Sequence, residues 1–185
     1  MSERTSTGEL PTPAATTALG RRLGGLLRAG DLVVLSGDLG AGKTTFTRGL
    51  ADGLGVRGPV TSPTFVIARV HPSLVGGPPL VHVDAYRLGS LAEVDDLDLD
   101  ASAGEAVTVV EWGSGMVEEL AEDRLEVDLL RPHGATAGDA GDAGDAGAEL
   151  DVPVEPRAVR LRAVGARWAG VDLAALLDPG PQAAP

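Results

Sequence analysis

Four residues in the first quarter of the chain have the types and spacing of a phosphate-binding loop. Gly37, Gly42, Lys43 and Thr44 fit the pattern Gly-x-x-x-x-Gly-Lys-[Ser/Thr]. Glycines let backbone N–H groups surround phosphate oxygens without a Cβ in the way, and the start of the following helix adds partial positive charge there. In this pattern the lysine reaches the β- and γ-phosphates, and the threonine hydroxyl binds Mg²⁺. The spacing therefore predicts a site for the phosphates of a nucleotide.

The surroundings of this pattern favour a phosphate site over an ordinary glycine-rich turn between a strand and a helix. An apolar run at 32–35 precedes it, and Phe46, Leu50 and Leu54 follow at helical spacing. Lys43 is the only lysine, against 14 arginines. A slim ammonium fits among phosphates where a planar guanidinium would not. The predicted nucleotide-binding residues of the loop are Gly37, Asp38, Leu39, Gly40, Ala41, Gly42, Lys43, Thr44 and Thr45.

Two carboxylates stand directly after apolar segments that have the length of buried strands. Asp84 follows 80–83, and Glu111 follows 107–110. A nucleotide site at the end of a parallel sheet requires a carboxylate in this position. The pair suits one group that binds Mg²⁺, directly or through water, and one that orients the attacking water. Spacing leaves open which carboxylate has which role, and it also allows Asp84 to be only a helix N-cap. The candidate catalytic residues are thus Lys43, Asp84 and Glu111, and the candidate Mg²⁺ ligands are Thr44, Asp84 and Glu111.

A group of hydroxyl residues, Thr61, Ser62 and Thr64, follows the predicted helix. Pro63 favours extended backbone at the serine before it. The hydroxyls suit a switch segment that senses the γ-phosphate or its Mg²⁺. They suit equally well the entry to a strand, where they would satisfy local backbone groups. Residue chemistry alone leaves both interpretations open.

Other polar and aromatic residues near these segments are expected to be structural. His82 alternates with inward-facing positions, and Trp112 suits either the core or stacking near the site, of which the core is favoured. Arg87 suits pairing with the acidic stretch 93–100 slightly better than contact with phosphate charge. The histidines do not have the spacing of zinc ligands.

The composition indicates one domain with a core of aliphatic residues. The chain has 185 residues, of which 43% are hydrophobic and only 3% aromatic. Its net charge of −12 argues against a broad nucleic-acid-binding surface. The absence of cysteine fits a reducing compartment, and the sequence has neither the pattern of a membrane span nor that of a signal peptide. We therefore expect a cytoplasmic protein without membrane contact.

The alternation of predicted elements indicates an α/β fold. The predicted helices follow Thr12 as far as Gly30 and cover 43–54, 114–120 and 173–177. The predicted strands cover 32–35, 65–70, 80–83, 107–110, 125–130 and 159–163. We expect a three-layer P-loop NTPase fold with a mixed, mostly parallel central sheet, in which the strands of 65–83 form an antiparallel hairpin.

Three segments of this single domain, 1–185, are expected to add little to its core. Residues 1–11 are polar and predict a loose or edge segment. Residues 133–156 contain a tandem Gly-Asp-Ala repeat without large apolar side chains, so they cannot offset the entropy lost on ordering and are expected to be a disordered insertion. Residues 178–185 are expected to be a tail.

Four motifs, in this order, resemble those of the bacterial TsaE (YjeE) family of ATPases, which act in the biosynthesis of N6-threonylcarbamoyladenosine in tRNA. They are Gly-Asp-Leu-Gly-Ala-Gly-Lys-Thr-Thr-Phe at 37–46, Ser-Pro-Thr-Phe at 62–65, His-Val-Asp-Ala-Tyr-Arg-Leu at 82–88 and Val-Glu-Trp at 110–112. The resemblance covers about residues 12–131, and more loosely 165–168. Ala85, where a larger apolar residue is usual, and the Gly-Asp-Ala insert depart from the family pattern.

The resemblance implies that the protein binds ATP and Mg²⁺ and works with the TsaD and TsaB proteins, which carry the transferase chemistry on adenosine 37 of certain tRNAs. ATP hydrolysis would then reset that complex, and tRNA would be met only through it. Ser62 and Thr64 match the family's switch motif, which favours a functional role for them. Thr16 is the nearest match to a family threonine that approaches the nucleotide.

Other nucleotide-dependent functions fit the residues less well. A small-molecule kinase would need an acceptor pocket and an arginine-bearing lid, which neither the acidic stretch nor the insert resembles. A nucleotide-binding module without hydrolysis would need only the loop. A Ras-like GTPase reads guanine with an Asn-Lys-x-Asp segment, but the chain has no asparagine and its one lysine is already used.

Overall fold

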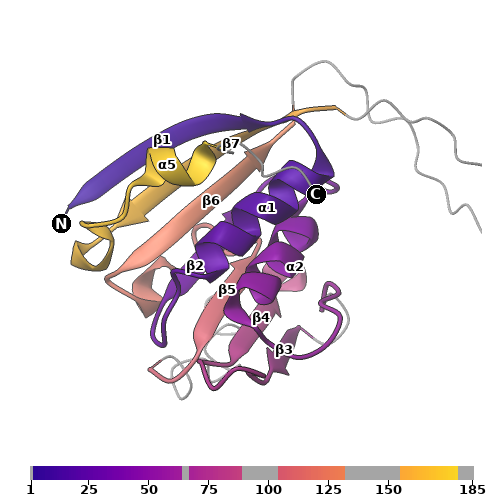
Figure 1. Ribbon diagram of the computed structural model, residues 1–185, viewed down its shortest axis with the longest axis vertical. Helices are drawn as coiled ribbons and strands as arrows, with labels where there is room; N and C mark the ends of the chain where they lie inside the picture. Colours follow the sequence, from indigo (N-terminus) through magenta and orange to yellow (C-terminus); the bar gives the residue numbers. More distant parts are fainter. Residues whose placement is uncertain (1, 64–66, 89–103, 132–154, 179–185) are drawn as a thin grey trace, which may run out of the picture.

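The computed structural model describes residues 2–63, 67–88, 104–131 and 155–178, and seven strands in these ranges form one sheet (Figure 1). From edge to edge their order is β1-β7-β6-β2-β5-β4-β3. The strands are β1 (Glu3–Leu10), β2 (Leu32–Ser36), β3 (Ala68–His71), β4 (Leu80–Asp84), β5 (Val107–Glu111), β6 (Arg124–Leu130) and β7 (Arg157–Val164). The described helices are α1 (Pro13–Gly24), α2 (Lys43–Leu54) and α5 (Leu173–Leu177), with 3₁₀ turns η1 (Ala85–Arg87), η2 (Glu118–Leu120) and η3 (Ala166–Trp168).

The centre of the sheet is parallel and its outer pairs are antiparallel. β2 runs parallel to both of its neighbours, β5 and β6, and β4 runs parallel to β5. The pairs β1–β7, β6–β7 and β3–β4 are antiparallel. The mixed α/β sheet and the antiparallel hairpin that the sequence predicts are therefore confirmed. The carboxyl ends of β2, β4 and β5 come together, with Asp84 opposite Glu111 in the register of β4 and β5.

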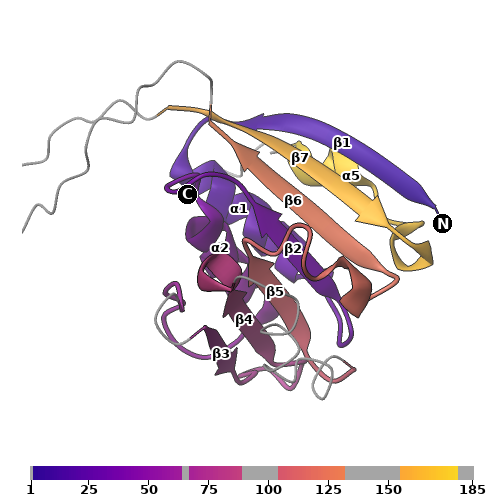
Figure 2. The same ribbon diagram turned by 180° about the vertical axis from the view of Figure 1, so that it is seen from behind.

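Helices α1, α2 and α5 cover one face of the sheet (Figures 1 and 2). Their apolar side chains, such as Leu23, Phe46 and Leu176, pack on inward-facing residues of β2, β5, β6 and β7. The opposite face carries a smaller core that includes Val34 and Val110. In the described chain, turns and η2 within residues 112–121 cover this second core, so the third layer there is not built from a long helix.

Helices α1 and α2 pack with their backbones in close contact because glycines of each helix face backbone carbonyls of the other. A Cβ on Gly20 of α1 would lie 2.2 Å from the carbonyl oxygen of Phe46, and one on Gly49 of α2 would lie 2.0 Å from that of Thr17. Gly24 and Gly53 meet carbonyl oxygens of the facing helix at 2.2 and 2.1 Å in the same way. The helix that begins at Lys43 is therefore fixed against α1 at backbone distance.

The first residues of the chain form edge strand β1, so the expectation of a loose segment over 1–11 is corrected in favour of its edge alternative. All of β1 pairs with β7, from Glu3 opposite Val164 to Leu10 opposite Arg157. The Arg162 guanidinium of β7 donates to both carboxylate oxygens of Glu3. The segment is polar and has little strand propensity of its own, so its order comes from pairing with β7.

Two predicted helices have different boundaries. Thr12 caps α1 as predicted, but the helix ends at Gly24 and not near Gly30. The consecutive glycines Gly24 and Gly25 weaken helical structure at that point. Ser114 begins a series of turns and does not cap a helix; helical geometry is confined to the short η2.

Some expectations fall on other parts of the chain. The insertion at 133–156, apart from its last two residues, and the tail at 178–185, apart from Asp178, lie outside the described residues. Among the helices that are described, none combines the length and the apolar character that a membrane span requires.

Replacing Gly20 by alanine should destabilise the fold, because the added methyl group would overlap the Phe46 carbonyl and force α1 away from α2. Overpacking of this kind costs about 2 kcal/mol or more, which corresponds to a fall in Tm of about 4–8 °C for a chain of this size. Thermal unfolding followed by circular dichroism measures the effect.

Gly25→Ala is the matched control at the end of the same helix. Gly25 has a φ of −68°, and an added Cβ would lie 3.6 Å from its nearest neighbour. This variant should unfold within about 2 °C of the wild type or slightly above it. Equal Tm values for the two variants would contradict the close packing of the helices.

Candidate functional site

Residues 37–42 form the loop that joins β2 to the first turn of α2. Gly37, Gly40 and Gly42 have φ angles of 138°, 74° and 107°, a region that residues with a side chain rarely adopt. A Cβ on Gly37 would also lie 2.3 Å from the carbonyl oxygen of Leu129. The path of the loop thus requires its glycines, and the structure has the strand, turn and helix that the sequence predicts.

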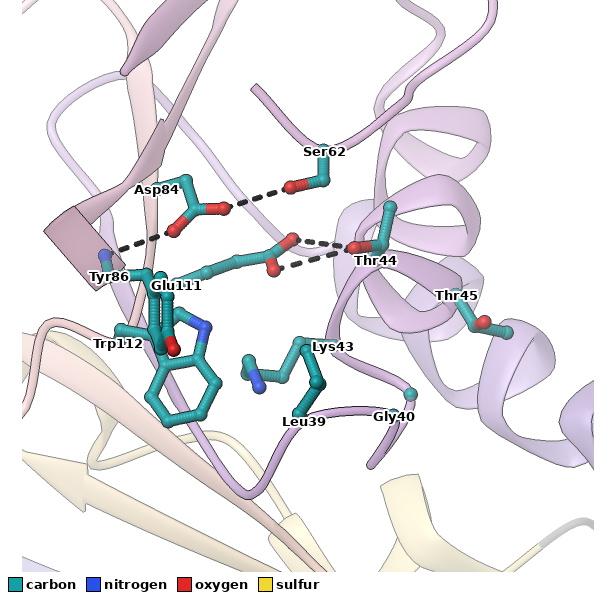
Figure 3. Close-up of a pocket in the computed structure, with 11 residues that line it drawn as sticks. Leu39, Gly40, Lys43, Thr44, Thr45, Ser62, Asp84, Tyr86, Glu111 and Trp112 are labelled. Atoms are coloured by element: carbon teal, nitrogen blue, oxygen red, sulfur yellow. Dashed lines mark hydrogen bonds between the residues drawn. The ribbon is translucent and has the colours of Figure 1, made fainter. Parts of the chain in front are cut away.

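An open pocket lies beside this loop, where β2, β4 and β5 end (Figure 3). Its lining combines residues from the loop, from the start of α2, and from the segments that follow α2, β4 and β5. The lining residues are Leu39, Gly40, Gly42, Lys43, Thr44, Thr45, Ser62, Asp84, Tyr86, Glu111 and Trp112. Tyr86 and Trp112 are the two among them that the sequence did not predict as site residues. The fold therefore brings both carboxylates and the first switch hydroxyl to the phosphate loop.

The Lys43 ammonium is buried within the loop and beside an aromatic ring. Its Nζ donates to the carbonyl oxygens of Gly37 at 2.7 Å and Asp38 at 3.0 Å. It also lies 3.7 Å from the centre of the Trp112 ring, within the range of a cation–π contact. Burial lowers the pKa of Lys43, and the nearby carboxylate of Glu111 opposes that shift. The ammonium is held at the loop by neutral acceptors that phosphate oxygens can replace.

The Glu111 carboxylate, at the end of β5, is only 2% exposed. Thr44 Oγ1 of the loop lies 3.3 and 3.4 Å from its two oxygens (Figure 3). His82 Nε2 lies 2.8 Å from Oε1, and Thr47 Oγ1 of α2 lies 3.5 Å from the same oxygen. Hydrogen-bond donors from a strand and a helix therefore hold this carboxylate next to the threonine of the phosphate loop.

Asp84, at the end of β4, contacts the predicted switch segment. Its Oδ2 accepts a hydrogen bond from Ser62 Oγ at 2.8 Å (Figure 3). Its Oδ1 accepts one from the Tyr86 N–H at 3.0 Å and so caps η1. The side chain thus caps a helical turn and lines the pocket at once, which combines the two interpretations that the sequence allowed. Thr64, the second predicted switch residue, lies outside the described residues.

The oxygen atoms at this end of the sheet fit a Mg²⁺ ion that is shared with phosphates. Within the part of the chain that the structure describes, His, Cys, Asp and Glu side chains do not form a group of three suited to hold a metal by themselves. The oxygen atoms available as Mg²⁺ ligands are Thr44 Oγ1 and those of the Glu111 and Asp84 carboxylates. Mg²⁺ binds oxygen, and it commonly takes one or two carboxylates while phosphates and waters complete its shell.

Known proteins resemble this chain in both sequence and fold. Residues 10–137 fit the family model described as "Threonylcarbamoyl adenosine biosynthesis protein TsaE". A Streptomyces coelicolor protein named tRNA threonylcarbamoyladenosine biosynthesis protein TsaE is 61% identical over 159 residues, which cover 85% of this chain and 97% of that protein. The chain belongs to the TsaE family.

TsaE proteins of other bacteria show the same likeness. The Mycobacterium tuberculosis protein is 52% identical over 132 residues, which cover 68% of this chain and 79% of that protein. The Bacillus subtilis TsaE is 42% identical over 120 residues, which cover 64% of this chain and 73% of that protein. The crystal structure of Bacillus subtilis YdiB matches with a TM-score of 0.61 at 31% identity and covers 89% of each chain. The predicted family and the predicted P-loop NTPase fold are confirmed.

In this TsaE-family chain, two aromatic residues that are not among the predicted site residues line the pocket. Trp112 is half-buried; it packs against the second core and also lines the pocket, which combines the two places that the sequence allowed. Its φ of 63° is rare for a residue with a bulky side chain. The Tyr86 ring lies 5.1 Å from it, centre to centre. The position of Trp112, directly after a carboxylate at the end of a strand and before Gly113, was the available signal.

Three further residues differ in how close they lie to the site. His82 faces inward as predicted, and it contacts Glu111. Its position two residues before Asp84 places it on the same face of β4, a signal that was present in the sequence. Thr16 is buried, and its methyl group faces Gly42, but it does not line the pocket. The acidic stretch expected to pair with Arg87 lies outside the described residues.

The lowered pKa of Lys43 predicts how its amine should react. Because burial disfavours the ammonium, the neutral amine forms at lower pH in the folded chain than in an unfolded one, where the lysine has a pKa of about 10.4. The rate of acylation by acetic anhydride, plotted against pH, should therefore have a lower midpoint in the folded protein. Peptide mass spectrometry identifies the label on the single lysine.

The same chain in 8 M urea is the control for this measurement. Steric protection by the fold slows acylation equally at every pH and does not move the midpoint, whereas a lowered pKa does. Identical midpoints for folded and unfolded protein would show that the ammonium is as well solvated as in water.

Proposed function

We propose that this protein is a slow, Mg²⁺-dependent ATPase of the cytoplasm that acts with TsaD and TsaB proteins in tRNA threonylcarbamoyladenosine biosynthesis. The observation that carries the proposal is the cluster of Lys43, Thr44 and Glu111 at a glycine-rich loop in a chain of the TsaE family. In this proposal ATP hydrolysis resets the transferase complex, and tRNA is met only through that complex. The net charge of −12 supports indirect contact, because a strongly acidic chain repels a nucleic acid backbone.

The loop supplies the groups that a triphosphate requires. The pocket lining includes Gly40, Gly42 and the first residues of α2, Lys43, Thr44 and Thr45, where backbone N–H groups and the helix N-terminus would attract phosphate oxygens. Lys43 would exchange the carbonyls of Gly37 and Asp38 for the β- and γ-phosphates, and in doing so would leave the face of Trp112. A bound Mg²⁺ would neutralise charge that develops on the phosphates.

The two carboxylates are proposed to have different tasks. Glu111 contacts Thr44, the predicted Mg²⁺ ligand, so we assign it to the metal side of the site, bound directly or through water. Asp84 contacts Ser62, so we assign it to the switch segment and to the orientation of the attacking water. The assignment rests on these distances, of 3.3 Å in the first case and 2.8 Å in the second.

Apolar side chains at the mouth of the pocket support a partner that covers it. Leu39, at the tip of the loop, is 81% exposed, and Tyr86 is 60% exposed. Exposed apolar side chains beside an open polar site are typical of surfaces that bind another protein. An open pocket also lets water compete with the bound groups, which fits slow turnover in the absence of a partner.

Purified protein should hydrolyse ATP slowly, and the rate should change when TsaD and TsaB are added. Phosphate release measures this rate with and without the partners. Efficient phosphorylation of a metabolite by the chain alone would decide instead for a small-molecule kinase.

Lys43→Ala should weaken ATP binding about 10–100-fold in calorimetry, because a charge-assisted hydrogen bond to phosphate is lost.

Replacing Glu111 by glutamine should reduce ATP turnover about 100-fold while the protein stays folded. The amide keeps the size of the side chain but removes the charge next to Thr44. Glu105→Gln makes the same change in charge at an exposed position and should turn over ATP like the wild type. If Glu111→Gln leaves a measurable wild-type rate unchanged, the proposed role of this carboxylate is wrong.

A further inference from the structure

A fully buried histidine contacts the proposed metal-side carboxylate from behind the pocket. His82 on β4 is 0% exposed, and its Nε2 lies 2.8 Å from Glu111 Oε1 on the neighbouring strand β5. His82 is not among the residues that line the pocket. It cannot touch a ligand there, so any effect that it has on the site acts through Glu111.

The contact with His82 is the shortest that either oxygen of the Glu111 carboxylate makes to a hydrogen-bond donor of the described residues. Oε1 lies 2.8 Å from His82 Nε2, 3.3 Å from Thr44 Oγ1 and 3.5 Å from Thr47 Oγ1. In the described part of the chain, the donor within hydrogen-bond distance of Oε2 is Thr44 Oγ1, at 3.4 Å. A carboxylate with one oxygen fixed by a strand neighbour cannot rotate freely, so both of its oxygens stay beside Thr44 at the phosphate loop.

The rest of the imidazole offers no other reason for a polar side chain at this position. Nδ1 of His82 is buried and has no hydrogen-bond partner among the described residues. An aliphatic residue of similar size would avoid that cost in an interior position. The hydrogen bond to Glu111 is thus the polar interaction that the histidine supplies.

We propose that His82 is a positioning residue that donates from Nε2 to Glu111 and fixes the carboxylate in the orientation that recruits Mg²⁺ to the nucleotide site. This inference rests on the proposed function, because it gives Glu111 a metal to bind. Partners that orient a metal-binding side chain commonly account for a 10–100-fold effect on metal affinity. His82 should therefore alter the dependence on Mg²⁺ and leave metal-free nucleotide binding intact.

The test measures binding and not turnover. The non-hydrolysable analogue adenylyl imidodiphosphate is titrated by calorimetry into the full chain at a series of Mg²⁺ concentrations. His82→Leu, which removes the donor, should raise the Mg²⁺ concentration that gives half of the maximal effect about 10–100-fold. Its affinity for the analogue in excess EDTA should stay within about twofold of the wild type.

Two more variants at the same position separate the hydrogen bond from the packing. His82→Gln places an amide N–H near the position of Nε2 and should restore the Mg²⁺ dependence to within about threefold of the wild type. His82→Asn has the same chemistry on a shorter side chain that does not reach Glu111, so it should behave like His82→Leu. If the leucine variant does not fold, the comparison of glutamine with asparagine still decides the question.

A second buried histidine provides the matched control. His71, on the adjacent strand β3, is 4% exposed and contacts the backbone carbonyl of Arg57 through Nδ1 instead of a carboxylate. His71→Leu should leave the Mg²⁺ dependence unchanged. An equal shift in His71→Leu and His82→Leu, or no shift in His82→Leu, would overturn the proposal. Wild-type protein whose affinity for the analogue does not change with the Mg²⁺ concentration would overturn the proposed metal role itself, and this inference with it.

Discussion

A buried carboxylate is the constraint on which the site depends. Removing a carboxylate from water costs several kcal/mol unless donors and cations replace the water. Glu111 meets this requirement with Thr44 from the start of α2 and His82 from the adjacent strand, while the Thr47 hydroxyl lies 3.5 Å away and donates to the nearer Lys43 carbonyl at 3.0 Å. Because the two donors come from α2 and β4, satisfying this single group fixes the helix that follows the phosphate loop and two neighbouring strands relative to one another.

The contact between α1 and α2 makes this arrangement rigid. Glycines at the interface allow helix backbones to approach until carbonyl oxygens fill the space that side chains would otherwise occupy. The start of α2 carries Lys43 and Thr44, so the same contact that builds the core also sets the position of the groups at the loop. Protein interiors transmit small displacements because they are densely packed. A shift of α1 would therefore reach the threonine that faces Glu111.

The sequence predicted those parts of the molecule whose signals are local. The phosphate loop has a spacing set by backbone geometry, and β4 and β5 are apolar runs that end in a carboxylate. β1 was missed as a regular strand because it is polar and its order depends on β7, which lies about 150 residues away. The contacts of Trp112 with the pocket and of His82 with Glu111 could not be predicted, because burial and hydrophobicity do not tell which neighbour a side chain meets.

The connection between β6 and β7 has a consequence for how the chain can vary. Its two ends are already neighbours, since Leu130 lies opposite Ala158 in an antiparallel pair. The length of chain between them is then nearly free of thermodynamic cost, because the entropy of closing a loop grows only slowly with its length. The connection starts at Arg131, whose guanidinium lies beside Gly40 at the pocket. The connection between β6 and β7 can therefore be lengthened, shortened or replaced next to the pocket while the sheet stays the same.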